Sequence, residues 1–274
     1  MIREPAVAGQ FYSSSPETLE ADVRRYMGPA QVGQKTIAVV SPHAGLMYSG
    51  HVAGAVFARV ALPTTVILIG PNHTGYGPPV SVYPRGAWRL PGGALSVDER
   101  TAAQILAQYP TAQPDLEAHR LEHCLEVQLP FLRHGRAGVQ IVPIVLGTSS
   151  QTRCQELGSC LAEVIRLAAH EPESVSLPLL LASTDMNHYE PDGLTREKDR
   201  HAIEAIERLD AEGLEAAVRH HQSSMCGLAP TMTILYAARA LGATRASLIR
   251  YATSGEVSGD YDQVVGYAGL TIDS

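Results

Sequence analysis

The chain has 274 residues, 45% of them hydrophobic, so it can bury the core of one large α/β domain. Its 21 Lys and Arg against 28 Asp and Glu give a net charge of −7, which argues against a nucleic-acid partner and a polybasic membrane patch. No signal-peptide segment or membrane-spanning apolar run is found, so we expect a cytoplasmic protein with no membrane partner.

Segments typical of strands and of helices alternate along the chain. Residues 36–40 and the wholly apolar run 65–69 are typical of buried strands, and residues 49–62 have helical spacing behind a capping-type Ser49. The remaining expected elements are helices at 98–109, 150–170 and 195–220 (broken near Gly213), and strands at 140–146, 177–182, 247–251 and 263–271. This alternation predicts a single α/β domain over residues 1–274, with a central, mostly parallel or mixed sheet flanked by helices.

Polar side chains follow three of the predicted strands. His43 comes just after the first strand, His73 after the second, and Asp185 with His188 after the strand at 177–182. Sites in open α/β sheets form beyond the carboxyl ends of strands, so these side chains should share one rim. Because imidazole is the commonest transition-metal ligand, the repeated pattern indicates a metal site.

Four cysteines, at positions 124, 154, 160 and 226, have the spacing of neither a zinc ribbon nor a disulfide scaffold, and we expect free thiols. Cys226 precedes a stretch with helical spacing that has Pro230 in its first turn. A helix N-terminus favours a thiolate, which binds metals or acts as a nucleophile, whereas the alternative is a small buried hydrophobic residue.

A second polar cluster lies at residues 119–126, where helical spacing would put His119 and His123, and also His123 and Glu126, on one face. His123 and Glu126 could bind a metal directly, but we favour a role in orienting the ligands, because metal-bound histidines usually donate their second N–H. The motifs GxSxG, GxGxxG and the P-loop do not occur. A hydrolase triad of Cys226, His188 and Asp185 is conceivable but gives two histidines no role.

The combination SPHAGLMYSG, GPNHTGYG, EHCLEVQLPFL, STDMNHY and MCGLAPT resembles the Memo family, whose prokaryotic members are called AmmeMemoRadiSam system protein B. The resemblance covers nearly the whole chain and implies a fold like that of class III extradiol dioxygenases. It implies metal ligands at His43, His73 and Cys226, with Asp185, His188 and Tyr48 in the same pocket. Phe11 stands where animal relatives have tryptophan, so we do not carry their phosphotyrosine-peptide binding over.

The resemblance makes Fe(II) the first choice of metal, with Cu and Zn as alternatives, because thiolate plus imidazole suits all three. In a dioxygenase-like oxidoreductase acting on an unknown small molecule, His188 would be the general base and Asp185 would set its tautomer. Two alternatives are a non-enzymatic redox or metal-binding protein and a peptide- or partner-binding scaffold. The family name implies a radical S-adenosylmethionine protein and an AMMECR1-like protein as partners.

Overall fold

The computed structural model describes residues 1–274 except 30, 148–149 and 170–175. A nine-stranded mixed sheet runs through the molecule, with a three-stranded sheet beside it. The large sheet consists of β2 (Ala38–Ser41), β3 (Thr65–Pro71), β4 (Val80–Val82), β7 (Gln113–Pro114), β8 (Gln140–Leu146), β9 (Leu179–Ser183), β10 (His188–Glu190), β11 (Arg245–Thr253) and β12 (Val264–Asp273). The small sheet consists of β1 (Ile2–Arg3), β5 (Ala87–Leu90) and β6 (Gly93–Ser96).

The centre of the large sheet is parallel, in the order β2-β9-β3-β8. Nearly every residue of these four strands is buried, as their continuous apolar runs require when both faces of a sheet are covered. Antiparallel strands extend the sheet on both sides, β12 next to β2 and β4 next to β8. The predicted α/β class with a mixed sheet is confirmed.

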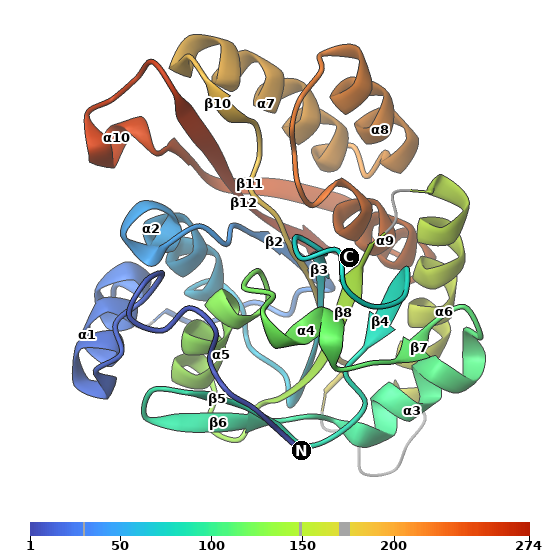
Figure 1. The fold of residues 1–274 in the computed structure, drawn as a ribbon. Helices are drawn as coiled ribbons and strands as arrows, with labels where there is room; N and C mark the ends of the chain where they lie inside the picture. The colour runs from blue at the N-terminus through green and yellow to red at the C-terminus, as the bar shows by residue number, and fades with distance from the viewer. Residues whose placement is uncertain (30, 148–149, 170–175) are drawn as a thin grey trace.

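Helices cover both faces of the sheet, with α1, α2 and α5 on one side in Figure 1 and α6 and α9 on the other. The helices are α1 (Pro16–Met27), α2 (Leu46–Phe57), α3 (Glu99–Gln108), α4 (Glu117–Arg120), η1 (Glu126–Gln128, a 3-10 turn), α5 (Leu129–Gly135), α6 (Gln151–Ala169), α7 (Asp192–Glu207), α8 (Ala211–His220), α9 (Leu228–Ala240) and α10 (Gly255–Ser258). Among the described residues, no helix combines the length and apolar character needed to cross a bilayer.

Several predicted helix boundaries are wrong, including the end of the helix expected at 49–62, which lies at Phe57, and the start of the helix expected from residue 195, which lies at Asp192. The helix expected to start at Ser49 begins at Leu46, because Gly45 occupies the N-cap position and the Leu46 N–H donates to the Phe11 carbonyl. The break expected near Gly213 lies earlier, between α7 and α8, where the Asp210 side chain accepts the Gly213 N–H and caps α8. Of the helix expected at 150–170, residue 170 lies outside the described residues.

The continuous helix expected through residues 119–126 is also wrong. Helix α4 ends at Arg120, and the chain turns irregularly until η1 begins. The buried Glu122 carboxylate accepts the main-chain N–H groups of His73 and Cys124, and these bonds hold the segment in a non-helical course. His119 and His123 consequently do not share a face: His119 is buried against Tyr83 and Trp88.

Candidate metal centre

Three histidines meet where the parallel strands end. His43 follows β2, His73 follows β3, and His123 comes from the turn between α4 and η1. Their ring centroids lie 5.2 Å (His43–His73), 5.4 Å (His43–His123) and 4.6 Å (His73–His123) apart. One ring nitrogen from each lies within 4.8 Å of the other two, a spacing at which three side chains can hold one metal ion.

The ring of His43 is held by Ser183, the last residue of β9. Ser183 Oγ lies 3.0 Å from His43 Nδ1 and 2.7 Å from the Cys124 carbonyl oxygen, to which the hydroxyl donates. Gln128 Nε2 also donates to Ser183 Oγ, at 2.9 Å. With its only proton used, the hydroxyl must accept from His43 Nδ1–H, which leaves Nε2 with a free lone pair. His43 is thus fixed in the tautomer that a metal ligand needs.

Glu122 serves the other two histidines. Its Oε1 lies 2.8 Å from His73 Nδ1 and 3.4 Å from His123 Nδ1, and its Oε2 accepts the His73 N–H at 2.6 Å. Burial acts to raise the pKa of Glu122, but the hydrogen bonds from His73 and the charge of its ring outweigh it and lower the pKa to about 2. The buried carboxylate is therefore ionised and orients the His73 ring through its Nδ1.

The three imidazoles have different electrostatic surroundings. Burial lowers the pKa of His43 well below its ordinary value, and the neighbouring His123 and His73 lower it further. Burial also lowers the pKa of His123. For His73, burial acts to lower the pKa, but the hydrogen bond and charge of Glu122 outweigh it and raise the pKa. His43 and His123 are accordingly neutral at pH 7 and offer lone pairs to a cation.

Cys226 borders the cluster on the side of His43. Its Sγ lies 3.4 Å from His43 Nε2 and accepts the Asp185 N–H at 3.2 Å. Within the described part of the chain, no group that includes Cys226 meets the 4.8 Å limit met by the three histidines. Burial raises the pKa of the Cys226 thiol to about 12, and the Asp185 carboxylate adds to the rise. The N-terminus of helix α9, which follows Cys226, was expected to favour the thiolate, but burial outweighs that effect.

Asp185 and His188 do not form the expected pair. Asp185 Oδ1 instead accepts the main-chain N–H groups of His43 at 2.8 Å and Ala44 at 3.3 Å. Burial raises the pKa of Asp185 to about 7, although those two bonds act in the opposite direction. His188 Nδ1 is buried and has no hydrogen-bond partner among the described residues, so the prediction that Asp185 sets its tautomer is wrong.

The other three predicted pocket residues have different surroundings. The Phe11 ring lies 4.9 Å from the His123 ring, and Tyr48, in the first turn of α2, packs against the small hydrophobic cluster that contains Tyr267. Glu126 instead bonds to the N-terminal segment. Its carboxylate accepts from Arg3 Nη1 at 2.6 Å, from the Tyr12 hydroxyl at 2.5 Å, and from the N–H groups of residues 6 and 7. Glu126 therefore anchors the segment that carries Phe11.

Three residues that orient the rings are absent from the predicted site: Glu122, Ser183 and Gln128. Two of them carried a signal, since Ser183 is the polar end of an apolar strand and Glu122 directly precedes His123.

A second set of ligating atoms, from His73, Glu122 and Cys124, also lies within 4.8 Å. In this set the Cys124 thiol donates to the Pro71 carbonyl at 3.3 Å, and burial raises the pKa of the thiol well above its ordinary value. Both features are typical of a packing role. The three imidazoles with Cys226 beside them form a nitrogen and sulfur donor set that suits Fe, Cu or Zn.

The sequence as a whole has known relatives. The model of the family described as "Memo-like protein" matches residues 3–271. A MEMO1 family protein of Methanopyrus kandleri is 40% identical over 98% of both chains, and one of Aquifex aeolicus is 41% identical over 98% of both. The crystal structure of an uncharacterized protein of Escherichia coli K12 aligns with a TM-score of 0.57 over 86% of this chain and 99% of that one, at 11% identity, and is similar in fold alone.

Proposed function

The chain belongs to the Memo family, and from that premise we propose that it binds one transition-metal ion, Fe(II), between His43, His73 and His123 with Cys226 beside them. The observation that supports this proposal is the convergence of three imidazole nitrogens within 4.8 Å. His43 Nδ1 is hydrogen-bonded to Ser183, and His73 Nδ1 is hydrogen-bonded to Glu122. The sequence motifs suggested two histidines and the thiol, and the geometry adds His123.

The metal proposal is tested by elemental analysis of protein purified without affinity-tag metals. We expect one ion per chain, and in the separate variants His73→Gln, His123→Gln and Cys226→Ser an affinity lower by more than the about 10- to 100-fold that loss of an orienting residue costs. His220→Gln is the matched control, because His220 is an exposed histidine at the end of α8 and should keep wild-type affinity. Metal-free wild-type protein, or undiminished binding in His73→Gln, would contradict the proposal.

We further propose that the site is dioxygenase-like and acts on a small aromatic diol. A bound Fe(II) would supply Lewis acidity and one-electron redox chemistry there. The observation that favours this function is the position of His188, whose ring lies close enough to the His43 ring for its charge to lower the pKa of His43. A neutral His188 ring can accept a proton from a substrate hydroxyl.

Oxygen uptake with a panel of catechols, measured on anaerobically iron-loaded protein, tests this second step. We expect uptake with at least one diol and a loss of about 100-fold or more in rate for His188→Gln, with iron content unchanged. Full iron occupancy without uptake for any diol would remove the dioxygenase proposal and leave metal binding intact. The partner proteins implied by the family name stay predictions.

A further inference from the structure

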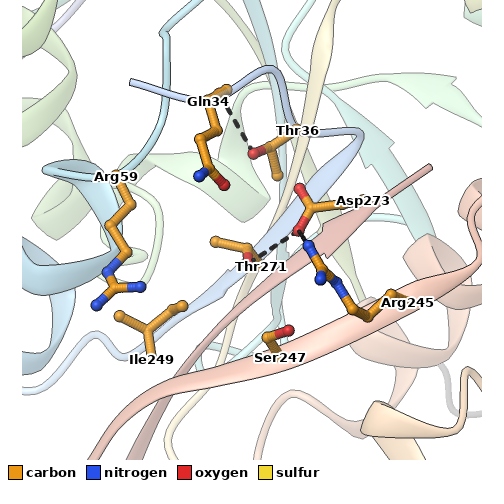
Figure 2. A pocket seen from close by; sticks show the side chains of 8 residues that line it. All are labelled: Gln34, Thr36, Arg59, Arg245, Ser247, Ile249, Thr271 and Asp273. Atoms are coloured by element: carbon orange, nitrogen blue, oxygen red, sulfur yellow. Dashed lines mark hydrogen bonds and ion pairs between the residues drawn. The ribbon is translucent and has the colours of Figure 1, made fainter. Parts of the chain in front are cut away.

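A pocket lies at the opposite end of the sheet from the histidines. Its volume is about 240 Å³, and Figure 2 shows the side chains around it, from Gln34, Thr36, Arg59, Arg245, Ser247, Ile249, Thr271 and Asp273. Strand β2 separates the two places, because Thr36 precedes its first residue whereas His43 follows its last. None of the metal-centre side chains lines this pocket.

The walls of the pocket are fixed by the main chain. On one side, Ser247 pairs with Thr271, and Arg245 with Asp273, in the antiparallel ladder of β11 and β12. On the other side, the Gln34 N–H donates to the Arg59 carbonyl at 2.7 Å, which ties the segment before β2 to the end of α2. Gly33 allows this approach, since a Cβ there would lie 2.5 Å from the Ala61 nitrogen.

One wall carries an unused acceptor. Asp273 is buried, with 9% of its surface exposed, and its Oδ1 has no hydrogen-bond partner in the described part of the chain. The other oxygen, Oδ2, accepts from Thr271 Oγ1 at 3.3 Å and lies 3.9 Å from Arg245 Nη2. That Arg245 side chain is 69% exposed, so this ion pair is weak. A buried carboxylate oxygen left without a donor is costly, and a ligand cation would satisfy it.

The facing wall carries an unused cation. Arg59 lies across the pocket from Arg245 and Asp273 in Figure 2, and its guanidinium has no hydrogen-bond or ion-pair partner among the residues that the structure describes. Ile249 of β11 lies beside Arg59 in Figure 2 and offers an apolar contact. The pocket therefore presents a donor for an anion on one side and an acceptor for a cation on the other.

We infer that this pocket binds a small zwitterion, with a carboxylate on Arg59 and an ammonium group on Asp273 Oδ1. A volume of 240 Å³ is below the range of about 300–1,000 Å³ typical of drug-sized ligands, which suits a molecule of amino-acid size. A simple anion would leave the buried Asp273 Oδ1 unpaired, and a simple cation would make no contact with the Arg59 guanidinium. The inference is independent of the metal proposal.

Calorimetric titration of the full chain with glycine, β-alanine, γ-aminobutyrate and δ-aminovalerate tests the inference, because the series varies the separation of the two charges. We expect at least one member to bind, and the matching fragments butyrate and butylamine to bind at least about tenfold more weakly. Arg59→Gln and Asp273→Asn should each weaken the amino acid about tenfold or more. Arg89→Gln, which removes the same charge from an exposed side chain of β5, is the matched control and should bind as wild type.

No binding by any member of the series would overturn the inference. So would butyrate binding as tightly as the amino acid with no effect of Asp273→Asn, which would make the pocket an anion site. Arg59 is exposed and its side chain supports no other residue, so Arg59→Gln should fold even if Asp273→Asn does not. Binding should be unchanged in His73→Gln, which separates this result from that of the metal experiment.

Discussion

At the scale of single residues, one buried carboxylate, that of Glu122, contacts two of the three histidines of the candidate metal centre. One carboxylate bonds to the side chain and main chain of His73, lies 3.4 Å from His123 Nδ1, and accepts the Cys124 N–H. Orientation by a buried carboxylate fixes both the direction and the tautomer of a ligating imidazole. Glu122 therefore links the ring geometry to the course of the loop that carries His123.

Replacing Glu122 by Gln should lower metal affinity about 10- to 100-fold, because the neutral amide is a weaker acceptor and orients the rings less firmly. Competition with a chelator, followed by metal analysis, measures the change. Glu117→Gln is the matched control, since among the described residues the Glu117 carboxylate pairs with the exposed Arg120 alone, at 3.1 Å. A dissociation constant for Glu122→Gln equal to that of the wild type would show that the carboxylate does not support the ligands.

At the scale of elements, helix α2 determines where the loop with His43 lies, and close packing against α1 holds α2 in place. A Cβ added at Gly54 would lie 2.5 Å from the main-chain carbonyl group of Tyr26, and one at Gly50 would lie 2.7 Å from the Tyr26 ring. Two glycines one turn apart thus let the helices approach closely. Main chain cannot move aside as a flexible side chain can.

We expect Gly54→Ala to destabilise the protein by about 1–3 kcal/mol, because the clash with Tyr26 exceeds the gain in helix propensity. Gly193→Ala is the matched comparison: Gly193 is in α7, and an added Cβ there meets nothing within 4 Å. That variant should be neutral or stabilised by up to about 1 kcal/mol. Urea unfolding of both variants measures the two effects, and equal stabilities would contradict the packing argument.

At the scale of the whole molecule, stability should depend on pH through Asp199. Burial raises its pKa to about 6 from an ordinary 3.8, although hydrogen bonds from Tyr251 at 2.7 Å and the Asn187 N–H at 2.9 Å act against the rise. The folded state therefore binds this proton more tightly than the unfolded state does. Its contribution is fully present below pH 3.8 and is lost as the pH rises to about 6.

The loss amounts to about 3 kcal/mol, at about 1.4 kcal/mol for each pKa unit. Asp199→Asn removes the titrating group, so the stability of the variant relative to the wild type should rise by about 2.4 kcal/mol between pH 4 and pH 7, because part of the contribution is already lost at pH 4. Urea unfolding of both proteins at several pH values measures the difference, in which the other titrating groups cancel. A difference that stays constant with pH would show that Asp199 is already ionised at pH 4.

Much of the fold follows from local patterns, whereas the details of the site do not. Apolar runs located the central strands, and β8 has the bounds that its run predicted. The same runs correctly brought His43 and His73 to one edge of the sheet. The irregular turn at Glu122 and the bonds of Asp185 to His43 and Ala44 depend on partners far away in the chain, which helical spacing does not contain. The assignment of ligands and metal remains a prediction.

The bonds of Asp185 have a mechanical consequence. The Asp185 carboxylate accepts the main-chain N–H groups of His43 and Ala44, and the Asp185 main-chain N–H donates to Cys226 Sγ. Three loops therefore meet at one residue. No one of these loops can move away without breaking bonds that also hold another. Amide protons at residues 43, 44 and 185 should therefore exchange with solvent as one cooperative unit, which opens all at once or stays closed.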